Sequence, residues 1–497
     1  MARKNEKGVA LILTLILLAV LSVMAVSLLF MAQSETWASM NYKLMTQARY
    51  GAEAGINQAA NYIQFTYTKP GTAQLANFSY TGVSPVTLAS SSTSPVFLSA
   101  NNSVTGNYPV SSMNSGFASA ATGSLAAGNT TITYSPYAKL LAMKTFTSFP
   151  SGSTDVVQTW EITSDATISG VRNGQVQASA ILEQPATPVF AYAAFATATG
   201  CSALTYGGGG STDSYDSTNY TTTGSGSSLQ LVTQQYGGNV GTNGNLDESG
   251  SSTTIYGSLS TPRSGTGSCS ASNVTALTTS GNATVTQGIV ELPQAISYQT
   301  PTVGTAPTGT VKFQGNDSGC PTFPAGTTGS CTLTSKGHFT LGPGSYPDLE
   351  FDANAVVTFT SGTYNVNSIL KGNGNSELDI NSSSGPVTMN LVGSGQSTVV
   401  DLTGSSIVNN SFDPSTFKIL YPGTGNVVLN GGNQTTALLY APNATAKFSG
   451  GGVWNGAVIV SKLTDLGGAV INYDRHLQVE IYQAGNYMLS SFTWKKY

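Results

Sequence analysis

The sequence is poor in charged residues. Asp, Glu, Lys and Arg together make up 8% of its 497 residues, and the formal net charge is −4. A nucleic-acid-binding surface needs a dense group of basic side chains to neutralise phosphates, and no such group occurs beyond the first seven residues. The sequence therefore gives no indication that the protein binds nucleic acid.

Catalytic and metal-binding motifs are also scarce. The two histidines, His338 and His476, have no metal-ligand spacing around them, and no G-x-S-x-G nucleophile elbow occurs. The glycine run at 207–210 does not open a helix after a strand, so it predicts a turn rather than a phosphate-binding loop. We expect no cofactor, no metal and no enzymatic activity.

The enzymatic alternative is a membrane-anchored surface protein that cleaves polysaccharide. Such an enzyme needs paired carboxylates on a groove, and Asp348, Glu350 and Asp352 alternate along one stretch of extended sequence. Solvation of a strand surface explains the same pattern. A glycan-binding protein without turnover is the related alternative.

Cysteine is rare, with four in the chain. All four follow the apolar N-terminal stretch, and none belongs to a C-x-x-C pair. In an oxidising compartment they suit two disulfides. Their spacing favours Cys320 with Cys331, and elimination then pairs Cys201 with Cys269, while free buried thiols are the alternative.

Glycine, serine, threonine and short runs of aliphatic residues make up most of the chain. There are 56 glycines, 40% of the residues are hydrophobic, and runs such as "VTMNLV", "FKILY" and "GAVIV" recur in the second half. Disordered chains lack such runs and carry more charge. The composition therefore predicts a folded, β-rich extracytoplasmic protein, whose length allows two or three domains.

An uncharged apolar stretch runs from Gly8 to Ser34 and is longer than the roughly 20 residues that a helix needs to span a bilayer. Arg3, Lys4 and Lys7 precede it, which favours a cytoplasmic N-terminus and an external body. Cleavage of a secretory signal within "SVMAVS" is the alternative, but apolar residues continue beyond that site.

The helix is expected to continue well past the apolar stretch. No proline occurs between Ala32 and Pro70, and one helix face is marked by residues that recur at three- and four-residue steps, namely Ala48, Ala52, Gly55, Ala59 and Tyr62. This pattern predicts one helix from about Val9 to Phe65, roughly 85 Å long at 1.5 Å per residue. A signal anchor with a helical stalk is the plain structural alternative.

These residues carry a family resemblance. The basic leader ending in Lys7-Gly8, the apolar helix directly after it and the later "ARYGAEAGINQA" resemble the N-terminal region of PilX-type minor type IV pilins. The resemblance implies cleavage by a prepilin peptidase after Gly8 and methylation of the new N-terminus at Val9. It also implies that Ala52, Glu53, Ala54 and Gly55 form the helix-packing signature of the family.

Leu13 departs from the pattern of major pilins. Major pilins carry a glutamate as the fifth residue after the cleavage site, where this chain has Leu13. That carboxylate meets the N-terminal ammonium of a neighbouring subunit within the apolar bundle, where an unpaired charge is costly. The departure therefore favours a minor subunit, including one at the tip, over the bulk subunit of a fibre.

The segment "VVQTWEITSDATISGVRNGQVQASAILEQ" predicts a β-hairpin. Apolar residues alternate on both sides of Asn173-Gly174, which is a strong short-range hairpin signal. A hairpin with one apolar face beside a helix with a small-residue seam fits a pilin head, with an independent β domain on a stalk as the alternative. The Ser/Thr-rich tract at about 71–130 reads as a loop-rich insertion.

Short apolar strands separated by Gly, Asn and Ser turns follow from about residue 188. Five apolar residues recur at about 17 to 22 positions, namely Phe339, Phe359, Ile380, Leu402 and Ile419. This is the spacing of rungs in a parallel β-solenoid, and a β-sandwich or jelly roll is the alternative. The sequence over most of 190–497 also resembles a C-terminal domain of unknown function that accompanies PilX-type N-termini.

The predicted fold class is α+β, with a long pilin-type helix on an antiparallel sheet followed by a large β-rich domain. The expected division is a leader (1–8), the helix (9–66, in the membrane to about 34), a pilin-like head (67–187), a solenoid-like domain (188–472) and C-terminal strands (473–497). These strands would either return to the head or cap the solenoid.

The expected function is that of a minor pilin or pilus-assembly protein, active in initiation, in the tip complex or in adhesion. Expected partners are other minor and major pilins, the prepilin peptidase, the inner-membrane assembly platform, and a tip adhesin or surface glycan. We expect a single-pass protein of the bacterial inner membrane that moves to the pilus or cell surface on assembly. The ligand, the tip or shaft position and the choice between a pilus and a secretion pseudopilus stay open.

Overall fold

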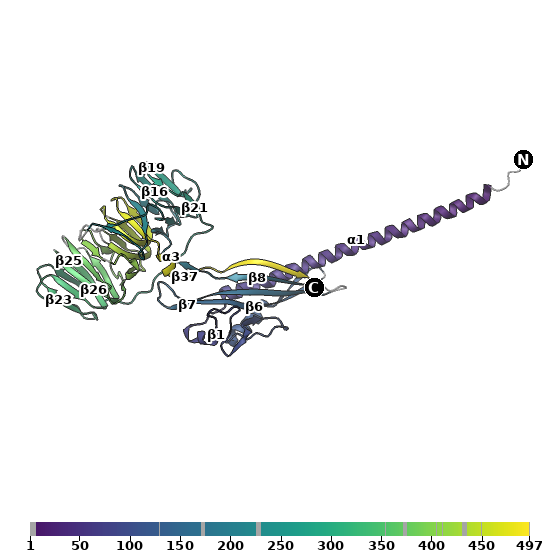
Figure 1. The fold of residues 1–497 in the computed structure, drawn as a ribbon, viewed down its shortest axis with the longest axis horizontal. Helices are drawn as coiled ribbons and strands as arrows, with labels where there is room; N and C mark the ends of the chain where they lie inside the picture. Colours follow the sequence, from purple (N-terminus) through teal and green to yellow (C-terminus); the bar gives the residue numbers. More distant parts are fainter. Residues whose placement is uncertain are drawn as a thin grey trace. The chain divides into compact units, whose positions relative to one another are not determined.

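The computed structural model describes residues 6–496 except 129, 170–173, 225–229, 353, 371–374, 404, 410, 430–434 and 449. The chain divides into two compact units, shown in Figure 1. The first comprises Met1–Phe146, Thr154–Thr187 and Ala484–Tyr497, and the second comprises Thr147–Ser153 and Pro188–Gln483. We call the first unit the head unit and the second the β body.

A single 60-residue helix, α1 (Glu6–Phe65), opens the chain. Its most apolar window has a mean hydropathy of 3.0 and is not buried by the protein, so the helix is long and apolar enough to cross a membrane. The predicted continuous helix is therefore present with nearly the expected ends. The predicted basic residues Arg3 and Lys4 lie outside the described residues, as does most of the predicted leader.

The C-terminal half of α1 lies on an antiparallel sheet in the head unit. The sheet has the order β38-β8-β7-β6-β4, and β5 also pairs with β6. Its strands are β4 (Phe97–Ser99), β5 (Gly123–Ala127), β6 (Thr130–Thr147), β7 (Thr154–Ser169), β8 (Gly174–Glu183) and β38 (Met488–Lys496). Alternate residues of β7 and β8 point to the helix side, which buries Trp160 and Ile162 completely.

The predicted hairpin corresponds to β7 and β8, which pair antiparallel with Ile168 opposite Gly174. Asn173 of the predicted turn lies outside the described residues. The returning C-terminal strand β38 pairs antiparallel with β8, with Met488 opposite Glu183. Of the two destinations considered for the C-terminal strands, β38 therefore takes the one in the head sheet.

The Ser/Thr-rich tract is more ordered than its composition suggests. It contains η1 (Thr72–Asn77), the small sheet β1 (Phe78–Ser79), β2 (Thr87–Leu88) and β3 (Ser91–Pro95), and the helix α2 (Ser111–Ala121). The Tyr62 hydroxyl of α1 donates a hydrogen bond of 2.9 Å to the Met113 carbonyl of α2. Only Phe117 and Ala121 of α2 are buried, so the sequence carries no clear helical periodicity there.

The β body is formed by two arms of the chain. The first arm carries β10 (Ala194–Ala196), β11 (Leu204–Tyr206), β12 (Ser211–Tyr215), β15 (Val240–Thr242), β16 (Leu246–Gly250), β17 (Thr254–Ile255), β18 (Leu259–Thr261), β19 (Leu277–Gly281), β20 (Thr284–Val285) and β21 (Ile289–Glu291). The short strands β13 (Thr222–Thr223) and β14 (Gln230–Leu231) form a separate antiparallel pair.

The second arm begins after a crossover at 292–309. It carries β22 (Thr310–Gln314), β23 (Cys331–Ser335), β24 (His338–Leu341), β25 (Gly344–Asp352), β26 (Val356–Thr360), β27 (Gly362–Leu370), β28 (Ser376–Asn381), β29 (Val387–Leu391), β30 (Thr398–Asp401), β31 (Ser405–Val408), η3 (Pro414–Thr416), β32 (Phe417–Leu420), β33 (Asn426–Leu429), β34 (Thr435–Phe448), β35 (Val453–Asp465) and β36 (Val470–Asp474). The helix α3 (Leu477–Glu480) follows, and the connecting strands β9 (Ala186–Pro188) and β37 (Tyr482–Ala484) pair with each other.

The strands of the two arms pair into one continuous parallel array, and we call each passage of the chain through this array a coil. Along one face the order is β22-β25-β27-β29-β32-β34-β35-β10-β15-β18-β21. The last coil of the second arm lies directly on the first coil of the first arm, with Val458 opposite Ala194 and Leu463 opposite Leu204. In Figure 1 the yellow C-terminal strands accordingly separate the teal first arm from the green second arm. The chain thus enters and leaves the stack in its middle.

Inward-facing apolar side chains fill the body along its length. Phe359 and Ile380 are register neighbours on β26 and β28, as their spacing predicted, and Phe339 of β24 lies opposite Val357 of β26. Ile419 instead lies on β32, which belongs to a different sheet. The predicted spacing therefore matches the register for Phe359 and Ile380 and does not match it for Phe339 or Ile419. The predicted architecture of a long helix with a large β-rich body is confirmed.

Candidate functional site

The N-terminal half of α1 exposes a continuous apolar surface. Large apolar side chains from Val9 to Met40 are about half exposed or more, and Leu13 is 61% exposed. Water solvates such a surface poorly, so a helix of this kind needs a bilayer or other apolar helices around it. Gly8 and Val9, the predicted processing residues, lie in the first turns of this helix.

The signature residues of α1 divide between its two sides. Ala52 is fully buried against the sheet and Gly55 lies there with it, whereas Glu53 and Ala54 are only partly buried. A β-carbon on Gly55 would lie 2.2 Å from the Ser164 hydroxyl oxygen of β7. Glycine is therefore required at this position because helix and sheet approach too closely for a side chain.

Glu53 acts on the outer side of the helix instead. Its carboxylate accepts a hydrogen bond of 3.0 Å from the guanidinium of Arg49, one helical turn earlier. The Arg49 guanidinium also lies 3.8 Å from the ring centroid of Trp494 on β38. Glu53 thus positions the Arg49 side chain that contacts the returning strand, which its sequence position alone did not indicate.

All four cysteines form disulfides in the β body. Cys201 bonds to Cys269 and Cys320 bonds to Cys331, the two pairings expected from the sequence. The first joins the loop between β10 and β11, in the first coil of the first arm, to the loop between β18 and β19, and the second ties the start of β23 to the loop after β22. Each arm therefore contains one covalent cross-link.

The three candidate carboxylates of the enzymatic alternative are all engaged in structural contacts. Asp348 accepts hydrogen bonds from Asn367, Ser368 and Gln396 at 2.6–2.9 Å. The Lys312 ammonium lies 2.9 Å from Asp352 and 3.8 Å from Glu350. These contacts hold adjacent coils together and leave no pair of carboxylates facing across a groove among the three.

A row of buried polar groups inside the body was not anticipated from the sequence. Asp465, Tyr206 and Glu248 are register neighbours on β35, β11 and β16, and all three are fully buried. Burial raises the pKa of Glu248 to about 7 and that of Asp465 to about 6. A β-carbon on Gly210 would lie 2.4 Å from the Asp465 carboxylate, so the glycine run makes the turn that covers this row.

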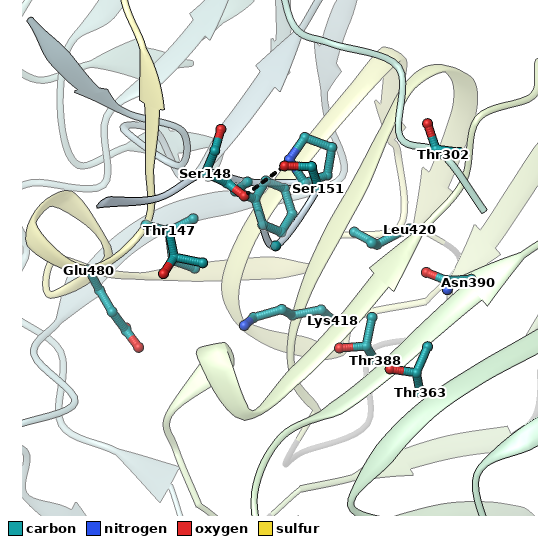
Figure 2. Close-up of a pocket in the computed structure, with 14 residues that line it drawn as sticks. Thr147, Ser148, Ser151, Thr302, Thr363, Thr388, Asn390, Lys418, Leu420 and Glu480 are labelled. Atoms are coloured by element: carbon teal, nitrogen blue, oxygen red, sulfur yellow. Dashed lines mark hydrogen bonds between the residues drawn. The ribbon is translucent and has the colours of Figure 1, made fainter. Parts of the chain in front are cut away.

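A cavity of about 390 Å³ with both polar and apolar lining lies on the outer face of the β body. Its floor is formed by β27, β29 and β32, and its walls by the turn 147–152, by the end of α3 and by Thr302 of the crossover. Figure 2 shows Lys418 extending across the cavity toward the side on which Glu480 and Thr147 lie. The sequence alone did not reveal this cavity, because its residues come from six separate stretches of the chain.

Comparison with known proteins identifies two parts of the chain. Residues 7–57 match the family model described as PilX N-terminal, and residues 314–480 match that of a domain of unknown function, DUF7305. The second match begins later than the expected start near 190. No curated protein matches the chain.

One similar solved structure is the crystal structure of the competence-associated pilin ComZ from Thermus thermophilus. It shares 13% identity, with 91% of this chain and 98% of that chain covered, at a TM-score of 0.28. A score this low supports no common fold. The comparisons therefore rest on the two family matches: the N-terminal segment at 7–57 is similar to the PilX N-terminal family, and residues 314–480 are similar to DUF7305, a domain of unknown function.

Proposed function

We propose that this protein is a minor pilin that joins a type IV pilus through α1 and carries the β body outward from it. One observation supports this above all: an uncharged apolar helix is exposed over its first half and is seated on a head sheet over its second. An apolar surface of this length is satisfied first by the bilayer and then by neighbouring pilin helices. The role is structural, and no residue is assigned to catalysis.

Processing belongs to the same proposal. The prepilin peptidase cuts after Gly8, Val9 becomes the methylated N-terminus, and the inner-membrane assembly platform then inserts the subunit with other minor and major pilins. Before assembly the chain crosses the inner membrane once with its N-terminus in the cytoplasm. In this proposal the chain comprises the leader (1–8), helix (9–66), head (67–187), body (188–472) and C-terminal strands (473–497).

The β body is a parallel β-solenoid in this proposal rather than a β-sandwich. The parallel pairing of β25 with β27 and of β27 with β29 supports that class, since sandwiches are built from antiparallel sheets. A body of this kind suits a role in initiation, in the tip complex or in adhesion to a surface. Leu13 supports a tip or other minor position, because it supplies no carboxylate for the N-terminus of a neighbouring subunit.

The direct test is the N-terminus of the protein purified from cells with a functional pilus system. Intact-mass measurement and N-terminal sequencing should find a methylated chain that starts at Val9, and a Gly8→Val variant should keep its leader. A start at Met1 in the unaltered protein would favour a simple membrane anchor, and a start near Val26 would favour secretion. Co-purification of other minor pilins with the unaltered chain, lost with the Gly8→Val variant, tests the assembly step.

A further inference from the structure

The cavity on the β body, with its mixed polar and apolar lining, has the chemistry of a ligand site. Its floor consists of two rows of outward-facing side chains that run across the coils. Thr363, Thr388 and Lys418 form one row through direct register pairing, and Asn390 and Leu420 form the next. Coils stack at about 4.8 Å, so the rows present hydrogen-bonding groups at regular intervals.

The wall opposite the floor is held firmly in place. The turn 147–152 inserts Phe149 between Phe190 and Tyr440, with ring centroids 5.2 Å and 4.9 Å away. The backbone of Phe149 also donates a hydrogen bond of 3.0 Å to the Tyr482 carbonyl. Within the turn, Gly152 donates to the Ser148 carbonyl at 2.8 Å. The cavity is therefore preformed and lies within the usual size range of small-molecule sites.

The charges in the cavity balance each other. Lys418 and Glu480 are its two charged lining residues, and no hydrogen bond or ion pair joins either side chain to another residue in the described part of the chain. Burial lowers the pKa of Lys418, while Glu480 and Asp413 act in the opposite direction. The ammonium and the carboxylate both retain hydrogen-bonding capacity for a ligand.

This lining selects against several ligand classes. A phosphate or carboxylate ligand would pair with Lys418 but face Glu480, and a cationic ligand would meet the reverse problem. A purely apolar ligand would leave the threonine hydroxyls, the Asn390 amide and both charges without partners, which costs binding free energy. A neutral ligand rich in hydroxyl groups can donate to Glu480 and accept from Lys418 at the same time. Leu420, Ile481 and Pro150 add apolar surface for its C–H groups.

We propose that this cavity binds a short neutral saccharide, about two rings at most. The ladder of Thr363, Thr388 and Lys418 binds its hydroxyl groups, and Glu480 accepts from a further one. The proposal rests on the proposed pilin function only in that the β body faces the cell exterior. Binding itself is a property of the isolated chain.

The test uses the full-length protein in detergent micelles. Calorimetry and saturation-transfer NMR would measure binding of glucose, galactose, mannose, N-acetylglucosamine and their common disaccharides, with glucuronic acid and glucosamine as charged comparators. Saturable binding of at least one neutral sugar is expected, in preference to both comparators. Absence of binding across the neutral panel, or preference for a charged comparator, would overturn the proposal.

Two variants locate the site. T388V removes one hydroxyl at constant shape and K418M removes the ammonium at similar length, and each should weaken binding about tenfold. The matched controls T332V and K447M change exposed residues of β23 and β34 outside the cavity and should bind normally. If T388V and K418M both bind the sugar as tightly as the unaltered protein does, the assignment of the site is refuted. Circular dichroism melting checks the fold, and E480Q provides a second probe if either variant is unstable.

The sugar measurement and the processing measurement fail independently. A chain that starts at Met1 yet binds a neutral sugar would refute the pilin role and leave the cavity assignment intact. A chain that starts at Val9 but binds no neutral sugar would refute the cavity assignment and leave the pilin role intact.

Discussion

Individual residues inside the β body determine how its stability depends on pH. Glu248 is fully buried, neither of its carboxylate oxygens has a hydrogen-bond partner among the described residues, and its pKa rises from 4.5 to about 7. Between these two values the folded protein binds a proton that the unfolded chain releases. The free energy of unfolding should therefore fall as pH rises from about 4.5 to about 7, with Asp465 adding to the fall up to about 6.

The variant E248Q tests this dependence. Glutamine keeps the size of the side chain and does not ionise, so we expect a flatter pH profile and a gain in stability at pH 8 on the order of 3 kcal/mol at most. Chemical denaturation of the β body from pH 4 to 8 measures both effects. E291Q alters an exposed glutamate on β21 and should keep the profile of the unaltered protein. If the free energy of unfolding of E248Q depends on pH in the same way as that of the unaltered protein, Glu248 does not titrate in this range.

The disulfides should contribute unequally to stability. The bond between Cys201 and Cys269 spans 68 residues and that between Cys320 and Cys331 spans 11. Loop-closure entropy predicts losses of about 4 and about 3 kcal/mol when the respective pairs are replaced by alanine. Denaturant titration of the two double variants measures the difference. A larger loss for the shorter loop would mean that contacts at β23, rather than chain entropy, dominate.

At the scale of elements, the contact between α1 and the head sheet depends on small residues. Gly55→Ala places a methyl group within 2.2 Å of the Ser164 hydroxyl, so helix or strand must shift. We expect a loss of about 1 to 3 kcal/mol in the stability of the head unit, measured by thermal unfolding. Gly71→Ala, with nothing within 4 Å of its new methyl group, should be nearly neutral. Ser164→Ala should recover part of the loss in the double variant, and no recovery would place the strain elsewhere.

Secondary-structure elements could be predicted from the sequence where the residues that indicate them are close together in the chain. The long helix and the β7–β8 hairpin were predictable, because an uncharged apolar run and alternation around a turn are readable within a few residues. Helix α2 was not, because it buries little more than Phe117 and Ala121 and is held by Tyr62 from a distant segment. The cavity and the Asp465–Tyr206–Glu248 row were also beyond reach, since both arise from register between coils far apart in sequence.

At the scale of the whole molecule, the β body is an insertion within the head unit. The head sheet is complete only when β38, made after the entire body, pairs with β8. The β body likewise joins early and late parts of the chain, because its first coil pairs with its last one. Sequence periodicity does not indicate which coils are neighbours, so only the spacing between coils could be predicted.

Removal of residues 486–497 should therefore affect the head and spare the body. Loss of β38 leaves β8 as an open edge, so we expect faster amide exchange in β8, a lower melting temperature of the head unit and a tendency to aggregate. Hydrogen exchange with mass spectrometry resolves the two units. Met488→Thr changes an exposed side chain of the same strand and should keep β8 protected. Unchanged exchange in β8 after the deletion would contradict a stabilising role for β38.

The return of β38 also has a mechanical consequence. The chain leaves the head sheet at Glu183 and comes back at Met488, and these two residues lie opposite each other on neighbouring strands. A tensile load on the β body therefore reaches the sheet through these two adjacent strand ends, and also through the ends of β6 and β7 that lead into the turn 147–153 of the body, and it is divided among them. Each strand carries only part of the pull, and the hydrogen bonds between β8 and β38 are spared from shear because both strands are drawn the same way. The head sheet gains resistance to unfolding under load from this arrangement.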